Sequence, residues 1–243
     1  MRHRAASVPY YKGSMSAPPV LTTRNLSGKY ILVRCSFLDL RLLDYNVAHQ
    51  NKVLSDSTDK IYKEQGVGWI ARRKLSTAPI VTAWIKHFRE RGREYLEIDE
   101  MFHKRNSATA ERYVLDGMPL EFNDVCGRPA VSRGWRMRTT EIKDQFLRRG
   151  WVNDAHSHGA IYTRVEGYVR GDLKRRWIEE QVRLAAFFCS RLYSSVSQTM
   201  GFQEIAGDRR FIRHIKFTTE KGEVVETRLV YDYCESGLDV TKA

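Results

Sequence analysis

Arginine and tyrosine residues near the C-terminal end of the chain are the side chains best suited to bind an anionic group. Arg213 and Arg228 lie in two neighbouring strand-like segments, and guanidinium groups bind carboxylates through two parallel hydrogen bonds. Tyr231 follows Arg228 by three residues, so the two side chains point to opposite faces of a regular strand unless a bulge intervenes. We predict Arg213 and Arg228 as an anion clamp. Alternatively, both arginines face solvent opposite Glu226 or Asp232.

Two tryptophans are candidates to line a ligand cavity or its entrance. Trp69 lies in a helical segment, and Trp84 lies in a strand-like segment that follows it. Aromatic side chains at such positions also occur in an ordinary core. Both interpretations stay open from the sequence.

A third set of polar side chains offers carboxylate and imidazole groups in alternation. On a strand, Asp154, His156 and His158 would share one face and could serve a metal ion or acid-base catalysis. The neighbouring asparagine, serine and glycine residues instead indicate a loop with solvated side chains. The chain also lacks a phosphate-binding glycine loop and the G-x-S-x-G and H-E-x-x-H motifs. We therefore expect no metal, no cofactor and no hydrolytic or nucleotide-driven activity, and the catalytic residues of any enzyme remain unknown.

Antiparallel strands must position these side chains. Residues 80–88 and 94–102 alternate between apolar and polar side chains around a polar turn, which predicts a hairpin. A second long hairpin is predicted for residues 209–217 and 223–233. Weaker strand candidates are residues 109–115, 132–139 and 160–169, and residues 141–149 are expected to form a helical turn or short helix.

A pair of short helices interrupts this strand-rich pattern once. Residues 59–65 read as a helix that Ser55 or Ser57 could cap, Gly66-Val67-Gly68 makes a corner, and a second helix follows up to Pro79. The pair falls between the first and second predicted strands.

The helix pair, the segment 28–30 and the basic triplet 72–74 carry a resemblance to a known family. The chain resembles the fatty-acid-binding proteins of the calycin group, and also a family of uncharacterised fungal lipocalin-like proteins. The resemblance covers residues 25–102 and the last hairpin. It implies a lipocalin or fatty-acid-binding-like β-barrel of about eight to ten strands with a helix-turn-helix lid after the first strand. In that family an Arg-x-Tyr pattern in the last strand holds a carboxylate, so the resemblance implies Tyr231 as a ligand-binding residue. The spacing from Arg228 to Tyr231 is one residue longer here.

Two segments break the pattern around them. Residues 33–50 and 182–198 both begin with Val-Arg and end with Gln. These residues can be encoded as the ends of an intron, so we interpret the segments as retained introns; the alternative is that they are genuine amphipathic insertions. We expect residues 1–24 to form a flexible leader, residues 25–235 a single barrel domain that carries both insertions, and residues 236–243 a tail.

Composition narrows the location and the partners. The formal net charge is +12 and is spread along the chain, which favours anionic partners. The basic N-terminal stretch lacks the apolar run of a secretory signal, and no segment has membrane-spanning length. We expect a cytoplasmic protein without a transmembrane segment, and the sequence leaves the oligomeric state open.

Three functions are compatible with these features. The first is an intracellular barrel that binds a hydrophobic, acidic small molecule, in a fungal secondary-metabolite pathway. The alternative is a cofactor-free cyclase or isomerase that folds a polyketide or terpenoid intermediate and supplies one acid or base. Nucleic-acid binding ranks below both, because alternation divides the basic residues of the strand at 209–217 between two faces.

Overall fold

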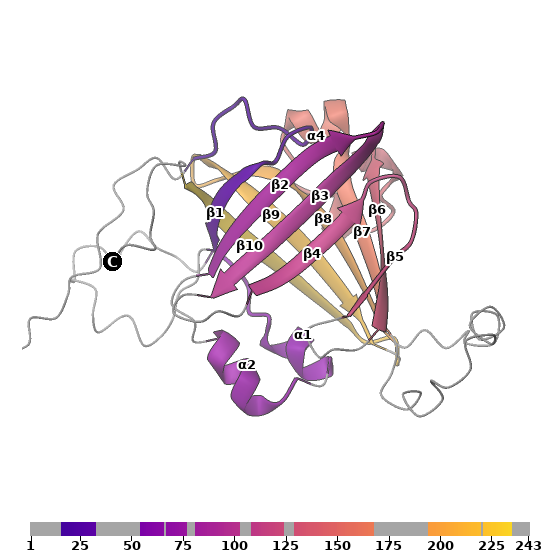
Figure 1. Cartoon of the computed structure of the whole chain (residues 1–243). Helices are drawn as coiled ribbons and strands as arrows, with labels where there is room; N and C mark the ends of the chain where they lie inside the picture. Colours follow the sequence, from indigo (N-terminus) through magenta and orange to yellow (C-terminus); the bar gives the residue numbers. More distant parts are fainter. Residues whose placement is uncertain are drawn as a thin grey trace, which may run out of the picture.

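The computed structural model describes residues 16–32, 54–65, 67–76, 81–102, 108–123, 129–167, 194–219 and 221–234. These residues form a ten-stranded antiparallel sheet that curls into a nearly closed barrel (Figure 1). The strand order is β4-β3-β2-β1-β10-β9-β8-β7-β6-β5. The prediction of a mainly antiparallel, lipocalin or fatty-acid-binding-like barrel is confirmed.

The elements have the following bounds in chain order. The strands are β1 (Gly28–Leu32), β2 (Val81–Glu90), β3 (Arg93–Phe102), β4 (Ala108–Val114), β5 (Leu120–Asn123), β6 (Pro129–Met137), β7 (Ala160–Gly167), β8 (Ser194–Ile205), β9 (Asp208–Thr218) and β10 (Val224–Cys234). The helices are α1 (Asp59–Glu64), α2 (Trp69–Ser76), the 3-10 helix η2 (Thr139–Glu141), α3 (Gln145–Arg148) and α4 (Asn153–His158).

Both predicted hairpins are present. β2 and β3 are joined by Arg91 and Gly92, which have φ angles of 49° and 78°. Two successive positive φ values produce the tight turn whose twist matches that of antiparallel strands. β9 pairs with β10 as the second hairpin, and the three weaker strand candidates correspond to β4, β6 and β7.

The barrel closes at one seam. β4 and β5 are the two ends of the sheet order. The hydroxyl of Ser132 on β6 lies 3.4 Å from the carbonyl of Arg112 on β4, across the seam, and 3.3 Å from that of Leu120 on its own partner strand β5. Gly117 N also donates to the carbonyl of Gly134 at 2.8 Å. A few contacts therefore take the place of a continuous ladder between β4 and β5.

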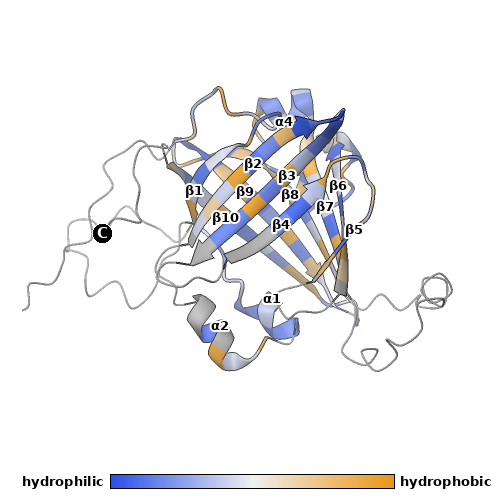
Figure 2. Cartoon of the chain, in the orientation of Figure 1, coloured by the Kyte–Doolittle hydropathy of each residue, from blue (hydrophilic) through white to orange (hydrophobic). Residues whose placement is uncertain are grey.

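Side chains along each strand alternate between the interior and the outer surface, as the colours of β2 and β3 illustrate (Figure 2). The inward side chains form the main core, which includes Tyr30, Phe202, Phe211 and Tyr231. A smaller apolar cluster lies outside the barrel, where Phe146, Leu147 and Trp151 of the β6–β7 connection join Ile212 and Val230, which are on the outward faces of β9 and β10.

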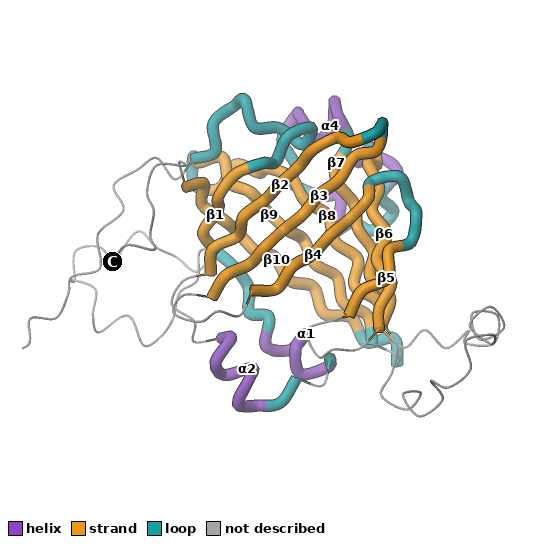
Figure 3. The backbone as a smooth tube through the Cα atoms, viewed as in Figure 1, coloured by secondary structure: helices purple, strands orange, loops and turns teal. Residues whose placement is uncertain are grey.

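The two ends of the barrel are covered differently (Figure 3). The helix pair α1 and α2 lies at one end, where Arg72 and Asp59 form an ion pair at 3.1 Å. At the other end lies the segment 16–27. We define these as the helix end and the N-terminal end.

Part of the predicted leader is packed onto the barrel. Ala17 N donates to the carbonyl of Arg209 at 2.6 Å, and Thr23 N donates to Asp154 Oδ2 at 3.0 Å. Leu21 and Leu26 are buried in the main core. Residues 16–24 therefore differ from the flexible leader that the sequence predicts, because their apolar side chains and backbone donors find partners on the barrel.

The structure describes part of only one of the two predicted insertions. Residues 33–50 lie outside the described residues. Of residues 182–198, the last five belong to β8, where they pair with both β7 and β9. Among the described helices, none combines the length and apolar character needed to cross a bilayer.

Candidate functional site

A buried polar cluster occupies the middle of the barrel interior. Arg213 is the central residue of β9 and lies on the same inward face as Phe211 and Ile215. Its side chain is only 4% exposed. We define the Arg213 cluster as Arg213, its hydrogen-bond partners Glu100, Glu111 and Gln198, and the two tyrosines that donate to these glutamates, Tyr113 and Tyr231.

The guanidinium of Arg213 is held by three strands. Nη1 donates to Glu100 Oε1 at 3.2 Å, and Nη2 donates to both Glu111 oxygens at 2.8 Å. Nε and Nη2 also donate to Gln198 Oε1, at 3.2 and 2.7 Å. Burial alone would lower the pKa of Arg213, but the negative charges of Glu111 and Glu100 outweigh it and raise that pKa well above its ordinary value. Arg213 is therefore a permanent buried cation.

Each glutamate also accepts a hydrogen bond from a tyrosine. Tyr231 OH donates to Glu100 Oε1 at 2.8 Å, and Tyr113 OH donates to Glu111 Oε2 at 2.7 Å. Burial is the main cause that raises the pKa of both tyrosines well above its ordinary value, and the adjacent glutamate charges add to it. Both phenols therefore stay protonated and act as donors at neutral pH.

The two predicted arginines lie on opposite faces of the sheet. Arg213 and Tyr231 point into the barrel, and both contact Glu100. Arg228 lies on the outward face of β10, where its backbone N donates to Asp56 Oδ2 at 2.8 Å and its guanidinium approaches the carbonyl of Leu54 at 3.4 Å. The structure thus separates the pair proposed as a clamp. In the β9–β10 register Arg228 lies opposite His214, which points outward, whereas Arg213 lies opposite Leu229, which points inward.

The two predicted tryptophans lie away from this cluster. Trp69 begins α2 and is 63% exposed, with the guanidinium carbon of Arg73 5.6 Å from its ring centroid. Trp84 is 40% exposed on the outward face of β2, where Lys29 Nζ lies 4.7 Å from its ring. Neither side chain is brought to the Arg213 cluster.

Asp154, His156 and His158 belong to the short helix α4 rather than to a loop or strand. The carboxylate of Asp154 accepts from Thr23 N and pairs with Arg209 at 3.1 Å, while His156 Nδ1 lies 2.7 Å from Thr139 Oγ1. Asp154 and His156 thus have separate neighbours. The described residues contain no group of three or more His, Cys, Asp or Glu side chains that could hold a metal ion.

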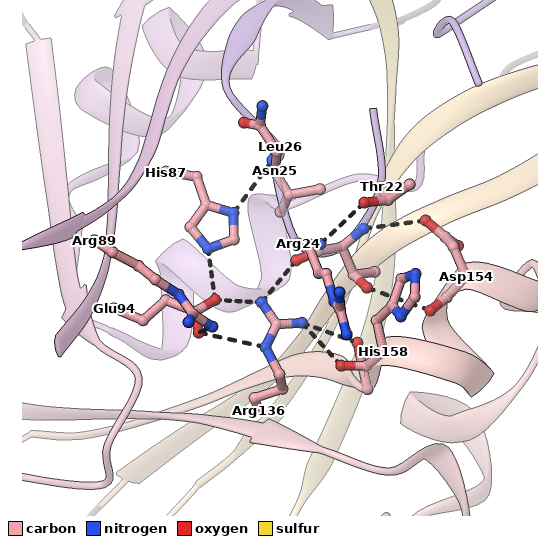
Figure 4. A network of polar contacts seen from close by, with 12 residues as sticks. Thr22, Arg24, Asn25, Leu26, His87, Arg89, Glu94, Arg136, Asp154 and His158 are labelled. Carbon is pink, nitrogen blue, oxygen red and sulfur yellow. Dashed lines mark hydrogen bonds and ion pairs between the residues drawn. The ribbon is translucent and has the colours of Figure 1, made fainter. Parts of the chain in front are cut away.

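A second polar network closes the N-terminal end of the interior (Figure 4). Arg136 binds Glu94 and donates through Nη2 to the carbonyl of Thr23 at 2.9 Å. His87 Nδ1 accepts from Leu26 N at 3.2 Å, so its Nε2 carries the hydrogen that faces Glu94 Oε1 at 2.8 Å. Burial would raise the pKa of Glu94, but hydrogen bonds from His87 and Arg136 lower it to about 2. This network ties the N-terminal segment to β2, β3 and β6.

Exposure differs between the two halves of the interior. Near the N-terminal end, the inward residues Ile161, Met200 and Phe202 are 0% exposed. Towards the helix end, Val165 and Val196 are partly exposed, although Phe217 stays fully buried. The Arg213 cluster lies between these halves, with the Glu111 side chain 25% exposed and that of Glu100 13%. Solvent therefore reaches Val165 and Val196 in the helix half of the interior and the glutamates of the cluster.

Sequence reasoning missed the two glutamates and Gln198. The signal was present for Glu100, because residues 96, 98 and 102 are apolar and share its face of the strand. A carboxylate at an inward position of an otherwise apolar face needs a buried partner. Gln198 was hidden because β8 begins with a run of serines in a segment interpreted as an insertion.

Comparison with known proteins gives structural similarity at low sequence identity. No protein-family model matches the chain, and no curated protein matches its sequence. Secretory abundant heat soluble protein 4 from Ramazzottius varieornatus aligns over 87% of this chain and 96% of its own, at 8% identity and a TM-score of 0.42. As-p18, an extracellular fatty acid binding protein, aligns over 86% of this chain and 95% of its own, at 13% identity and a TM-score of 0.40. The strand order and register of the sheet, not these similarities, support the barrel fold.

Proposed function

We propose that this protein binds a hydrophobic small molecule in the helix half of the barrel interior, with Arg213 and Tyr231 at the polar end of the ligand. The carrying observation is the unequal exposure of the interior. Side chains in a core with a purely structural role pack to high density, and the N-terminal half meets that description. The partly exposed inward residues Val165 and Val196 next to a few convergent polar groups have the composition of a ligand site.

A cofactor-free isomerase or cyclase is the second candidate. The observation that favours it is the pair of tyrosine–carboxylate contacts, Tyr231 with Glu100 and Tyr113 with Glu111, at 2.8 and 2.7 Å. A carboxylate next to an apolar wall can act as a general base, and a phenol can act as a general acid. A cytoplasmic location and a place in fungal secondary metabolism stay predictions from the sequence.

Two adjacent valines on β10 provide a matched test. Val225 points inward and is 8% exposed, whereas Val224 is 45% exposed. Val225→Trp fills the helix half of the interior, and Val224→Trp adds the same side chain outside it. Binding of a hydrophobic probe such as decanol to the full chain, measured by native mass spectrometry, should be lost in the first variant and kept in the second.

Stability must be measured in parallel, because an added large side chain in a packed core can cost about 1–3 kcal/mol. Urea unfolding identifies a Val225→Trp variant that fails to fold. Equal probe binding by both folded variants would contradict the proposed location. A probe recovered chemically unchanged supports a carrier, and conversion of a bound natural molecule supports the enzyme.

A further inference from the structure

We propose that the polar end of the ligand is a protonated amine rather than a carboxylate. This inference rests on the proposed function and specifies the chemical class of its ligand. It differs from the acidic ligand expected from the sequence. Its basis is the way in which the Arg213 cluster distributes charge and hydrogen bonds.

Arg213 has little capacity left for an anionic ligand. Of its five N–H groups, the one on Nε, one on Nη1 and the two on Nη2 are directed at Gln198, Glu100 and Glu111. A ligand carboxylate that binds Arg213 through two parallel hydrogen bonds would have to displace a glutamate that is already bound and leave that glutamate without its cation. Breaking such a buried ion pair is costly.

The cluster carries an excess of negative charge and one unused carboxylate oxygen. One guanidinium faces two carboxylates, Glu100 and Glu111, so the formal sum is one negative charge. Both tyrosines are already donating, and Glu100 Oε2 accepts no hydrogen bond from the part of the chain that the structure describes. An ammonium group supplies both the missing positive charge and up to three donors.

A second polar group faces the same interior. Thr227 lies on the inward face of β10, between Val225 and Leu229, and is 1% exposed. Its hydroxyl oxygen has no hydrogen-bond partner among the described residues. Its register partner on β9 is Ile215, two residues from Arg213. This hydroxyl is therefore a further acceptor available to a donor group on a ligand.

The exposed fractions of the side chains indicate which members of the Arg213 cluster an entering ligand contacts first. The glutamates are the accessible members of the cluster, since their side chains are 13% and 25% exposed while that of Arg213 is 4%. A molecule that enters the helix half of the interior thus meets carboxylates before it meets the guanidinium. The apolar part of the molecule would lie along Val165, Val196 and Ile215.

Three ligands that share the same ten-carbon alkyl chain and differ only in their head group test this proposal. Decylamine, decanol and decanoate are titrated into the full-length protein at pH 7 and 0.15 M salt, below their aggregation concentrations, by isothermal titration calorimetry. A charge-assisted hydrogen bond predicts that the amine binds at least about tenfold more tightly than decanoate. The overall charge of +12 works against this order, so long-range attraction cannot produce it.

Two isosteric variants locate the source of the preference. Glu100→Gln removes the excess carboxylate and should abolish the preference for the amine, while Glu226→Gln makes the same change at an exposed position on β10 and should keep it. Decanoate binding most tightly, or an amine preference that survives Glu100→Gln, would overturn the inference and leave the proposed function standing. Failure of all three compounds to bind would overturn both.

Discussion

Lowering the pH from 7 to 5 should destabilise this protein through one buried histidine, His214. The imidazole lies on the outward face of β9 and is 2% exposed. The ring centroids of Phe146 and Trp151 are each 4.8 Å from that of His214. Burial, assisted by the positive charge of Arg149, lowers the pKa of His214 from 6.5 to about 4.

The sign of the effect follows from comparing the two states. The pKa is lower in the folded protein than in the unfolded chain, so the unfolded chain binds more protons between pH 6.5 and pH 4. Stability from this group is therefore complete above pH 6.5 and is lost as the pH falls towards 4. With these two pKa values, the free energy of unfolding falls by about 2 kcal/mol between pH 7 and pH 5.

Urea unfolding at pH 7, 6 and 5 measures this loss. His214→Gln removes the titrating group, and its free energy of unfolding should lose about 2 kcal/mol less over that range than that of the unaltered protein. Ile142→Val serves as the control, because it weakens the same apolar cluster at every pH without removing a ring that packs on His214, and it should keep the slope. A His214→Gln variant with the pH slope of the unaltered protein would show that His214 is not the source of the pH dependence.

Two further predictions concern the cluster and the seam. Arg213→Met leaves both glutamates of the cluster without their cation and should cost about 3–5 kcal/mol in urea unfolding; replacing both glutamates with glutamine in the same chain should recover much of that loss, and a fully stable single variant would contradict the assigned ion pairs. Gly117→Ala adds a Cβ 2.4 Å from Trp135 Nε1 at a φ of +80°, and should destabilise the seam more than Gly92→Ala, which has a similar φ of +78° but open space around it. Equal thermal unfolding temperatures for the two glycine variants would show that the Trp135 contact carries no cost.

Much of the barrel could be predicted from the sequence because local rules agree with the tertiary structure. The alternation at residues 94–102 and the glycine in the turn before it predict β3 and its hairpin, and the structure contains both. The helix pair was also predictable, since Gly66-Val67-Gly68 separates two helical stretches between strands. At these positions propensity, periodicity and turn chemistry all favour the same structure.

The rest depends on contacts that no local pattern contains. The first half of β8, Ser194 to Gln198, contains three serines and a single apolar residue, and it becomes a strand because β7 and β9 pair with it on both sides. The sequence identified Arg213 and Tyr231 as candidates, but the partners of Arg213 are 113 and 102 residues away on β3 and β4. Arg228 is a similar residue in a similar strand, and only the register of β10 decides that it points outward.

The proposed binding site is best tested by finding where in the barrel a hydrophobic molecule binds. Methyl-resolved NMR of the full chain, with isoleucine and valine methyl groups labelled, can follow a titration with decanol. Binding in the helix half predicts that the signals of Val165, Val196 and Ile215 shift in proportion to occupancy, while that of Ile161 near the N-terminal end stays in place. Shifts confined to residues on the outer surface, or no saturable shift at any inward methyl group, would contradict it.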